Sequence, residues 1–386
     1  VVVTASHNPP EFNGLKYKPD YGGSAGPAVV ARLEEETARA QQGPALVLVP
    51  FAAALADGRI QMVDPRPAYR EQVGRLVDLT AVTGAGLRIL HDPMYGAGIG
   101  YVAALLEGGT TTVEALHAER NPGFGGLHPE PIPPNLDAAM DRIRAGGFDL
   151  GIANDGDADR VGIIDETGSF VDQLEVATLL LWHLCERRGW RGPVVRSLTS
   201  TRRLDILGER YGCVVEELPV GFKHLGPRMA EIDAILGAEE SGGFGFRGHL
   251  PERDGILSGL FFAEMIVQAG RPLSALRREL AELVGPHAYA RHDRRFDRND
   301  YARQRAAVGE RLRSAPPAEI AGAAVVRTRT DDGFKFWMAD GSWVLVRMSG
   351  TEPLMRVYSE ADTPERVQAL LSGLEAVVGA GAATHG

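Results

Sequence analysis

Short apolar runs alternate with helix-like segments along most of the chain, and this alternation constrains the fold more than any other feature. Runs such as Leu87–Leu90, Val161–Ile164 and Val194–Leu198 are strand-like, whereas Leu174–Arg188 has the length and pattern of a helix. Strands that alternate with helices form parallel or mixed sheets covered by helices. Because 386 residues exceed the usual size of a single core, several α/β domains are expected.

The region after residue 290 has a different pattern. Short strand-like runs follow one another there, separated by Asp332-Gly333 and Asp340-Gly341 turns, and a helix is predicted over Pro364–Val377. This order is typical of an α+β domain. The charged segment Arg291–Asp300 is predicted to be a solvated connector. The expected fold is therefore three consecutive α/β domains with mixed sheets plus a C-terminal α+β domain, with limits at 1–72, 73–172, 173–290 and 291–386.

The first residues, Val1–Val3, have the pattern of a buried strand, and a buried strand needs neighbours on both sides. Because nothing precedes them, we expect that upstream sequence is missing and that the first domain is N-terminally incomplete.

Charge and composition narrow the range of partners. The net charge of −10 disfavours nucleic acids and anionic membranes, and no uninterrupted apolar run reaches the length of a membrane-spanning helix. The two cysteines, Cys185 and Cys213, lie in no metal-binding spacing, so buried thiols and a cytoplasmic location are expected.

A serine loop follows the first strand, in the stretch Thr4-Ala5-Ser6-His7-Asn8-Pro9. A serine after a strand can project toward the sheet edge where α/β proteins place their chemistry, and His7 could polarise its hydroxyl or bind a phosphate. Lys16 could return beside the serine on the next strand. On residue types alone, a polar turn with an incidental Ser and His is the competing interpretation.

Three aspartates lie in one short loop, Asp155-Gly156-Asp157-Ala158-Asp159-Arg160, between two apolar runs. Carboxylates that converge in this way repel one another unless a cation is present, and their hard oxygens suit Mg²⁺. Arg160 adds a positive charge suited to a transferring phosphoryl group. An EF-hand calcium loop is the sharpest alternative, but it needs flanking helices and a glycine in place of Arg160. A second alternative is that the loop is an ordinary acidic turn exposed to solvent.

Two further loops are weaker signals. Glu239-Glu240-Ser241-Gly242-Gly243 offers acceptors and close backbone approach to sugar hydroxyls. Arg347-Met348-Ser349-Gly350-Thr351, with Arg356 on the next strand, could cradle a phosphate through guanidinium, hydroxyl and backbone N–H donors. Taken singly, each could equally be an ordinary polar loop.

In combination the four loops resemble those of the α-D-phosphohexomutase family, which includes phosphoglucomutase and phosphomannomutase. The TASHNP, DGDADR, EESGG and RMSGTEP stretches occur in the family's order along the whole chain. The resemblance implies four domains around a central cleft. It also implies an intramolecular phosphotransferase that carries a phosphoryl group on Ser6 and passes through glucose 1,6-bisphosphate, which serves as intermediate and activator.

The resemblance assigns expected roles to individual residues. Those implied to hold Mg²⁺ are Ser6, Asp155, Asp157 and Asp159. Those implied to act around the serine are His7, Lys16 and Arg160. Those implied to bind the substrate are Lys223, Glu239, Ser241, Arg347, Ser349, Gly350, Thr351 and Arg356.

The resemblance is incomplete, because the family's N-terminal segment with its active-site arginine has no counterpart here. Two rival functions therefore stay open: a truncated, non-catalytic sugar-phosphate-binding protein, and a Mg²⁺-dependent phosphatase that uses the aspartate loop alone. Gly243 follows the EESG stretch, where mannose- and glucosamine-type relatives tend to carry His. Glucose phosphates are thus the favoured substrates and mannose phosphates the second choice. A monomer or homodimer is expected.

Overall fold

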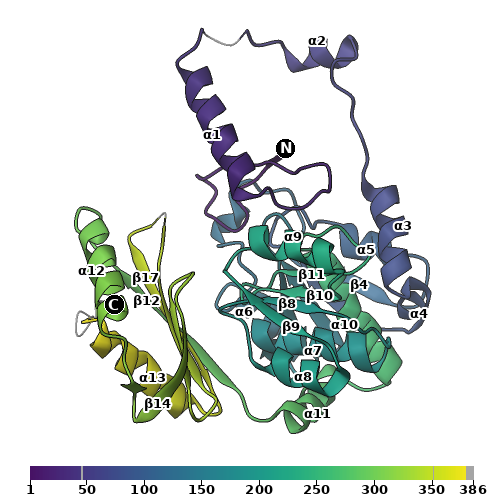
Figure 1. The fold of residues 1–386 in the computed structure, drawn as a ribbon. Helices are drawn as coiled ribbons and strands as arrows, with labels where there is room; N and C mark the ends of the chain where they lie inside the picture. Colours follow the sequence, from purple (N-terminus) through teal and green to yellow (C-terminus); the bar gives the residue numbers. More distant parts are fainter. Residues whose placement is uncertain (45–46, 351, 380–386) are drawn as a thin grey trace.

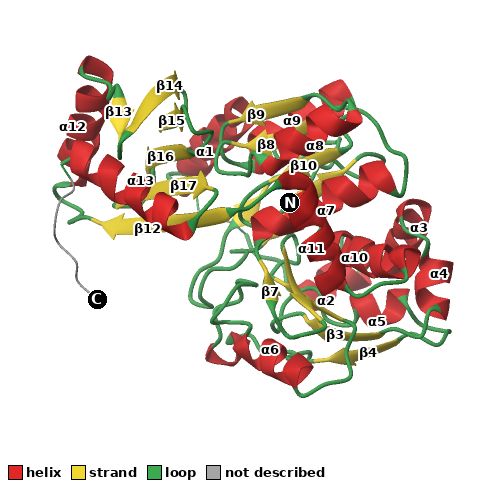
Figure 2. Cartoon of the chain, turned by 90° about the horizontal axis from the view of Figure 1, so that it is seen from below, coloured by secondary structure: helices red, strands yellow, loops and turns green. Residues whose placement is uncertain are grey.

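Four β-sheets organise the described residues, and each sheet occupies a successive stretch of the chain. The three larger sheets can be followed in Figures 1 and 2. The computed structural model describes residues 1–44, 47–350 and 352–379. The sheets have two, five, four and six strands in the order of the sequence. The expected succession of α/β units followed by an α+β domain is confirmed. No helix among the described residues is long and apolar enough to cross a membrane.

The N-terminal unit is a two-stranded antiparallel ribbon followed by helices. Its elements are β1 (Val2–Val3), β2 (Leu15–Lys16), α1 (Pro27–Gln41) and α2 (Phe51–Ala56). The expectation that Val1–Val3 is buried is wrong for this structure, because Val1 is 79% and Val3 65% exposed. The reason is that β1 pairs on one side only, with β2.

The second unit carries a mixed five-stranded sheet in the order β4-β3-β5-β6-β7. Its elements are α3 (Arg66–Leu76), α4 (Leu79–Gly84), β3 (Arg88–Asp92), α5 (Tyr101–Leu105), β4 (Thr112–Ala115), the 3₁₀ turn η1 (Phe124–Gly126), α6 (Asp137–Arg144), β5 (Leu150–Asn154), β6 (Val161–Asp165) and β7 (Phe170–Val171). Strand β3 is parallel to β4 and β5, whereas β6 runs antiparallel to β5. The expected domain limit between residues 72 and 73 falls inside α3, and the domain limits stay a prediction.

The third unit has three parallel strands and one antiparallel edge strand, in the order β11-β10-β8-β9. Its elements are α7 (Gln173–Glu186), β8 (Val194–Ser197), α8 (Arg203–Tyr211), β9 (Val215–Leu218), α9 (Phe222–Ile232), β10 (Leu236–Ala238), β11 (Phe244–Phe246), α10 (Gly255–Ala269) and α11 (Leu273–Val284).

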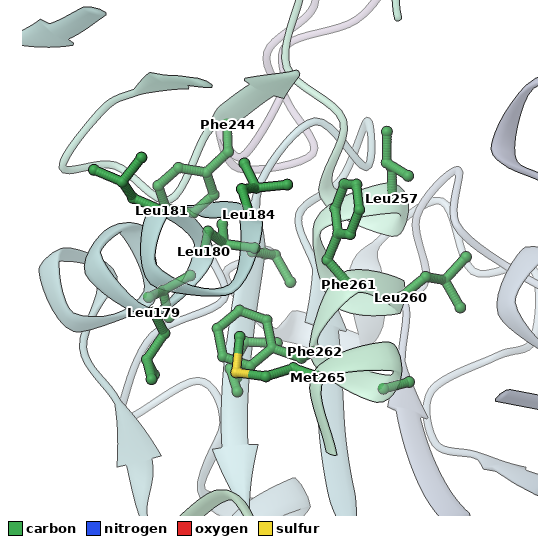
Figure 3. Packing of buried hydrophobic residues seen from close by; sticks show 14 of the residues in the cluster. Leu179, Leu180, Leu181, Leu184, Phe244, Leu257, Leu260, Phe261, Phe262 and Met265 are labelled. Carbon is green, nitrogen blue, oxygen red and sulfur yellow. The ribbon is translucent and has the colours of Figure 1, made fainter. Parts of the chain in front are cut away.

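One hydrophobic core joins the second and third units. Helices α7 and α10 supply Leu180, Leu184, Phe261 and many neighbouring apolar side chains to it (Figure 3). Helix α10 also packs against β5, and at Gly259 an added Cβ would lie 2.5 Å from Ile152. Because interiors are close-packed, this shared core fixes the ends of β5 and β10 relative to each other. Loops that follow these strands are therefore held in a defined spatial relation.

The C-terminal domain forms a separate antiparallel sheet in the order β12-β17-β16-β15-β14-β13, with its own core (Figure 1). Its elements are β12 (Ala288–Arg295), α12 (Tyr301–Ser314), β13 (Glu319–Ile320), β14 (Ala323–Arg329), β15 (Phe334–Met338), β16 (Trp343–Met348), β17 (Leu354–Ala361) and α13 (Pro364–Val377). The prediction of a solvated connector over Arg291–Asp300 is wrong in its first half. Residues 291–295 belong to β12, because they pair in continuous register with β17.

Candidate active site

The serine loop connects β1 to β2 and lies against the aspartate loop. Ser6 has a φ of +56°, a left-handed conformation that is uncommon for residues other than glycine. Its amide donates to Oγ1 of Thr4 at 2.8 Å, and Thr4 in turn donates to Oδ2 of Asp157 at 3.1 Å. An added Cβ at Gly156 would lie 2.2 Å from the carbonyl oxygen of Ser6. The two loops therefore interlock, and this contact requires glycine at position 156.

Three carboxylates converge at the turn between β5 and β6. Asp155 is fully buried, and one oxygen from each of Asp155, Asp157 and Asp159 lies within 4.8 Å of the others. The hydroxyl of Ser6 donates to Oδ2 of Asp155 at 2.9 Å. The predicted serine and aspartate loops are thus brought together. Because the flanking elements are antiparallel strands, the EF-hand alternative is wrong.

The carboxylate cluster has the donor set of a site for a hard divalent cation. Oδ1 of Asp157 and Oδ1 of Asp159 are buried and have no hydrogen-bond partner within the described part of the chain. Buried oxygens without partners are unfavourable unless something else satisfies them. Mg²⁺ prefers carboxylate oxygens and accepts a further oxygen, so the residues present fit this ion together with an oxygen at Ser6.

Lys16 reaches this cluster from β2. Its Nζ lies 2.6 Å from Oδ2 of Asp157 and 3.5 Å from Oδ2 of Asp159. Burial opposes a charged lysine, but Asp159 and Asp157 together raise the pKa of Lys16. Burial and the neighbouring Asp159 raise the pKa of Asp155, whereas Lys16 outweighs burial and lowers the pKa of Asp157. The ammonium of Lys16 therefore balances part of the cluster's negative charge.

His7 and Arg160 lie on the open side of the serine. Nδ1 of His7 is 3.4 Å from Oγ of Ser6, and burial followed by the charge of Arg160 lowers the pKa of His7 to about 3. The amide of Arg160 donates to Oδ1 of Asp155 at 2.9 Å, and its Nη1 lies 3.4 Å from Oε1 of Glu130. His7 therefore lies beside the hydroxyl of Ser6, whereas Arg160 is held against Asp155 and Glu130.

Sequence reasoning missed two residues beside this group, His128 and Glu130. Glu130 contacts Arg160, and the ring of His128 lies 6.0 Å from the ring of His7, centroid to centroid. Both side chains line the cavity in front of the serine. The available signal was the stretch His128-Pro129-Glu130-Pro131, in which two prolines restrict a histidine and an acid.

Arg253 is a third missed residue, and it joins the aspartate loop to the predicted sugar loop. Its Nη2 lies 2.6 Å from Oδ2 of Asp159, and its Nη1 lies 3.2 Å from Oε2 of Glu239. Glu239 is 3% exposed, and burial raises its pKa against the effect of Arg253. The sugar loop turns between β10 and β11, and Glu240 there accepts a hydrogen bond from Thr199 at 2.6 Å. No sequence motif pointed to Arg253, because its role depends on the tertiary fold.

The predicted phosphate loop is the turn between β16 and β17. Arg347 forms an ion pair with Asp332, with Nη2 and Oδ1 separated by 2.9 Å. The hydroxyl of Tyr301, at the start of α12, donates to the carbonyl oxygens of Ser349 and Leu354 at 2.5 and 3.1 Å. Tyr301 therefore holds both ends of the turn. An added Cβ at Gly350 would meet no atom within 4 Å. Thr351 lies outside the described residues.

A polar cavity of about 680 Å³ joins these parts. Among the predicted site residues, those that line it are His7, Arg160, Ser241 and Arg356. Lys16 and Lys223 instead line a second cavity of about 640 Å³ beside α1. Arg347, Ser349 and Gly350 are not among the residues that line the first cavity. The structure thus unites the serine, aspartate and sugar loops around this cavity, and the predicted phosphate loop and the strand after it meet the cavity through Glu352, Leu354 and Arg356.

Comparison with known proteins agrees with this arrangement. The four family models of the phosphoglucomutase/phosphomannomutase group match in order: domain I over residues 1–43, domain II over 67–168, domain III over 172–284 and the C-terminal domain over 305–376. The chain belongs to the α-D-phosphohexomutase family. It is accordingly a phosphohexomutase-type enzyme, an intramolecular phosphotransferase, as the sequence predicted.

Similar members of the phosphohexomutase family differ in their names. A probable phosphoglucosamine mutase of Methanopyrus kandleri is 33% identical over 96% of this chain and 76% of its own length. A phosphoglucomutase/phosphomannomutase of Thermococcus kodakarensis is 31% identical over the same shares. The crystal structure of a putative phosphomannomutase from Thermus thermophilus superposes with a TM-score of 0.79 at 34% identity, covering 98% of this chain and 77% of that one. The chain therefore spans about three quarters of the length of these relatives.

Proposed function

We propose that the chain interconverts hexose 1-phosphate and hexose 6-phosphate through a phosphorylated Ser6 and a hexose 1,6-bisphosphate. The observation that carries this proposal is the 2.9 Å hydrogen bond from Oγ of Ser6 to Asp155 within the three-carboxylate cluster. A hydroxyl beside a site for a divalent cation is placed to carry a phosphoryl group. The surrounding cations, Lys16 and Arg160, are suited to the phosphoryl oxygens.

In the first half-reaction the bond from phosphorus to Oγ of Ser6 breaks while a free sugar hydroxyl bonds to phosphorus. The hydroxyl proton moves to Oγ, which leaves with the electron pair, and His7 is within reach to relay it because Nδ1 lies 3.4 Å away. The resulting bisphosphate turns around, and its other phosphoryl group returns to Ser6. The products are a phosphoserine and the isomeric monophosphate, so no group is gained or lost.

The remaining residues hold the substrate and the ion. Asp155, Asp157 and Asp159 would hold Mg²⁺, which neutralises phosphoryl oxygens when bound. Glu239 and Ser241 are proposed to bind the sugar hydroxyls. Those proposed for the non-reacting phosphate are Arg347, Ser349, Gly350, Thr351 and Arg356, and Lys223 is proposed as a further substrate-binding lysine of the third unit. Remote binding of this kind retains the intermediate while it turns.

We propose glucose phosphates as the preferred substrates and mannose phosphates as the second choice. The basis is Gly243, which follows the EESG stretch where the resemblance associates His with mannose- and glucosamine-type relatives. Because a relative is named a probable phosphoglucosamine mutase, glucosamine phosphates belong in the same test.

The test is conversion of glucose, mannose and glucosamine 1-phosphates to the 6-phosphates, with Mg²⁺ and a trace of the matching bisphosphate. We expect turnover that Ser6→Ala abolishes and Ser169→Ala preserves. Ser169 is exposed between β6 and β7, at the other end of β6 from the carboxylate cluster. Turnover by Ser6→Ala at the unmutated rate would exclude the phosphoserine route. Release of inorganic phosphate in place of isomerisation would favour the phosphatase, and binding without turnover would favour the binding protein.

A further inference from the structure

One face of the β12–β17 ribbon forms a wall of the active-site cavity. Three register pairs contribute to it: Arg291 opposite Tyr358, Asp293 opposite Arg356, and Arg295 opposite Leu354. All six side chains line the 680 Å³ cavity. Because side chains alternate along a strand, positions 291, 293 and 295 share this face.

The intervening residues of β12 point the other way. Ala290 packs against the core of the C-terminal domain, and Nδ1 of His292 lies 3.0 Å from Oε1 of Glu375 on α13. Strand β12 therefore has one face that packs against its own domain and a second, charged face that lines the cavity. That charged face explains why the sequence resembled a solvated connector.

The two outer residues of this face, Arg291 and Arg295, are arginines whose guanidinium groups retain N–H donors for a ligand. Nε of Arg291 lies 2.8 Å from Oδ1 of Asp293, a contact that engages one edge of the guanidinium. The side chain of Arg295 forms no hydrogen bond or ion pair with any other described residue. Arg356 adds a third guanidinium, 3.7 Å from the other oxygen of Asp293. Arginine forks suit phosphate oxygens bidentately.

The arginine of the predicted phosphate loop, by contrast, is already paired with a carboxylate. Arg347 is paired with Asp332, and Oδ2 of the same aspartate accepts the amide of Val220 at 2.7 Å. Arg347 is not among the residues that line the cavity, whereas Arg291, Arg295 and Arg356 are. In this conformation, the cavity that would hold a phosphate is lined by the arginines of the ribbon and not by Arg347.

We propose that Arg291 and Arg295 form, with Arg356, a phosphate-binding surface on the β12–β17 ribbon that retains the hexose bisphosphate while it turns around. This inference rests on the proposed function. Asp293 contacts the guanidiniums of both Arg291 and Arg356 and lowers the net charge of the surface. Because the carboxylate of Asp293 offsets part of the arginines' positive charge, the surface attracts a phosphate less strongly than three arginines alone would. A bound phosphate can therefore be released to the serine or to the phosphate loop.

The experiment is calorimetric titration of the full chain with glucose 1,6-bisphosphate in Mg²⁺, comparing the unmutated chain with Arg291→Gln, Arg295→Gln and the double variant. Loss of a charge-assisted contact is expected to weaken binding by about tenfold for the double variant. The matched control is Arg294→Gln, on the same strand but not among the residues that line the cavity, which is expected to leave the affinity unchanged. In a turnover assay, the double variant is expected to need more added bisphosphate for its half-maximal rate.

Several outcomes would overturn the inference. Equal affinity in the double variant and the unmutated chain would do so, as would an equal loss in Arg294→Gln, which would indicate general charge attraction. If hexose phosphates are isomerised but the variants bind bisphosphate normally, this inference fails while the proposed function stands. If the unmutated chain neither binds bisphosphate nor isomerises any hexose phosphate, the proposed function fails with it. Equal thermal midpoints of all variants are required as a check of folding.

Discussion

Nη2 of Arg253 lies 2.6 Å from Oδ2 of Asp159, and this contact ties the segment before α10 to the carboxylate cluster. The other guanidinium nitrogen contacts Glu239 of the sugar loop, which is almost fully buried. One side chain therefore contacts a candidate cation ligand and a candidate sugar-binding residue at the same time.

Replacement of Arg253 by Met is expected to lower both stability and activity. Glu239 would be left buried without its cation, which costs about 3 kcal/mol of unfolding free energy, measurable by chemical denaturation. The value of kcat/KM is expected to fall at least about tenfold, because the sugar and metal loops lose their common support. Combining the change with Glu239→Gln should recover part of the stability and none of the activity. Full activity in Arg253→Met would contradict the proposed coupling of the loops.

Replacement of Asp157 by Asn is expected to weaken magnesium binding and leave the fold intact. A ligand that binds only the folded state raises the midpoint of thermal unfolding. Added Mg²⁺ should therefore raise the midpoint of the unmutated chain clearly more than that of Asp157→Asn. Asp141→Asn is the control, because Asp141 is 73% exposed on α6 and pairs with Arg144. An equal response to Mg²⁺ in all three proteins would place the ion elsewhere.

Replacement of Tyr301 by Phe removes the hydroxyl that holds both ends of the phosphate loop. A hydrogen bond of this kind contributes about 1 kcal/mol, so KM for the sugar phosphate is expected to rise about fivefold with little change in kcat. Tyr211→Phe is the matched control, since the Tyr211 hydroxyl contacts Glu186 and lies outside the cavity. A fall in kcat at constant KM would show that Tyr301 acts in the chemical step instead.

Lys335 makes stability depend on pH. Its side chain is buried between the third unit and the C-terminal domain, where Nζ lies 2.6 Å from Glu217, and burial followed by the charge of Arg196 lowers its pKa to about 7. Below pH 7 Lys335 is protonated in both the folded and the unfolded chain. Between pH 7 and about 10 it is mostly neutral in the folded chain and protonated in the unfolded chain, so the unfolded chain binds more protons. The unfolding free energy attributable to Lys335 therefore rises with pH across that window, by up to about 3 kcal/mol.

The measurement is the unfolding free energy of the unmutated chain minus that of Lys335→Met, at pH 7 and at pH 10. This difference is expected to become more favourable to the unmutated chain at the higher pH. A difference that is independent of pH would mean that Lys335 titrates in the folded chain as it does in water.

Local patterns sufficed for the parts of the fold and site that depend on neighbouring residues. The apolar runs on either side of Asp155–Asp159 are strands, and the helix over Pro364–Val377 has the predicted limits. Convergence of the aspartates follows from a tight turn between two buried strands. The proximity of Ser6 was anticipated through the family resemblance.

Features that depend on distant residues were not predictable in this way. Helix α9 contains Gly226 and Pro227, which disfavour a helix, yet an added Cβ at Gly226 would lie 2.4 Å from the carbonyl oxygen of Pro251. Tertiary packing therefore selects glycine there. Strand β12 was hidden by its charges, because a wall of a polar cavity has the same composition as a solvated segment. Arg253 belongs to no motif, and its role depends on where α10 places it.

The most direct test of the central claim is transfer of labelled phosphoryl groups from glucose 1,6-bisphosphate to the chain, quenched rapidly and mapped by peptide mass spectrometry. The proposal predicts label on the peptide that contains Ser6, and its loss to the sugar when unlabelled glucose 6-phosphate is added. Label on the peptide that contains Asp155, Asp157 and Asp159, or turnover with no labelled protein, would contradict a mutase that works through Ser6.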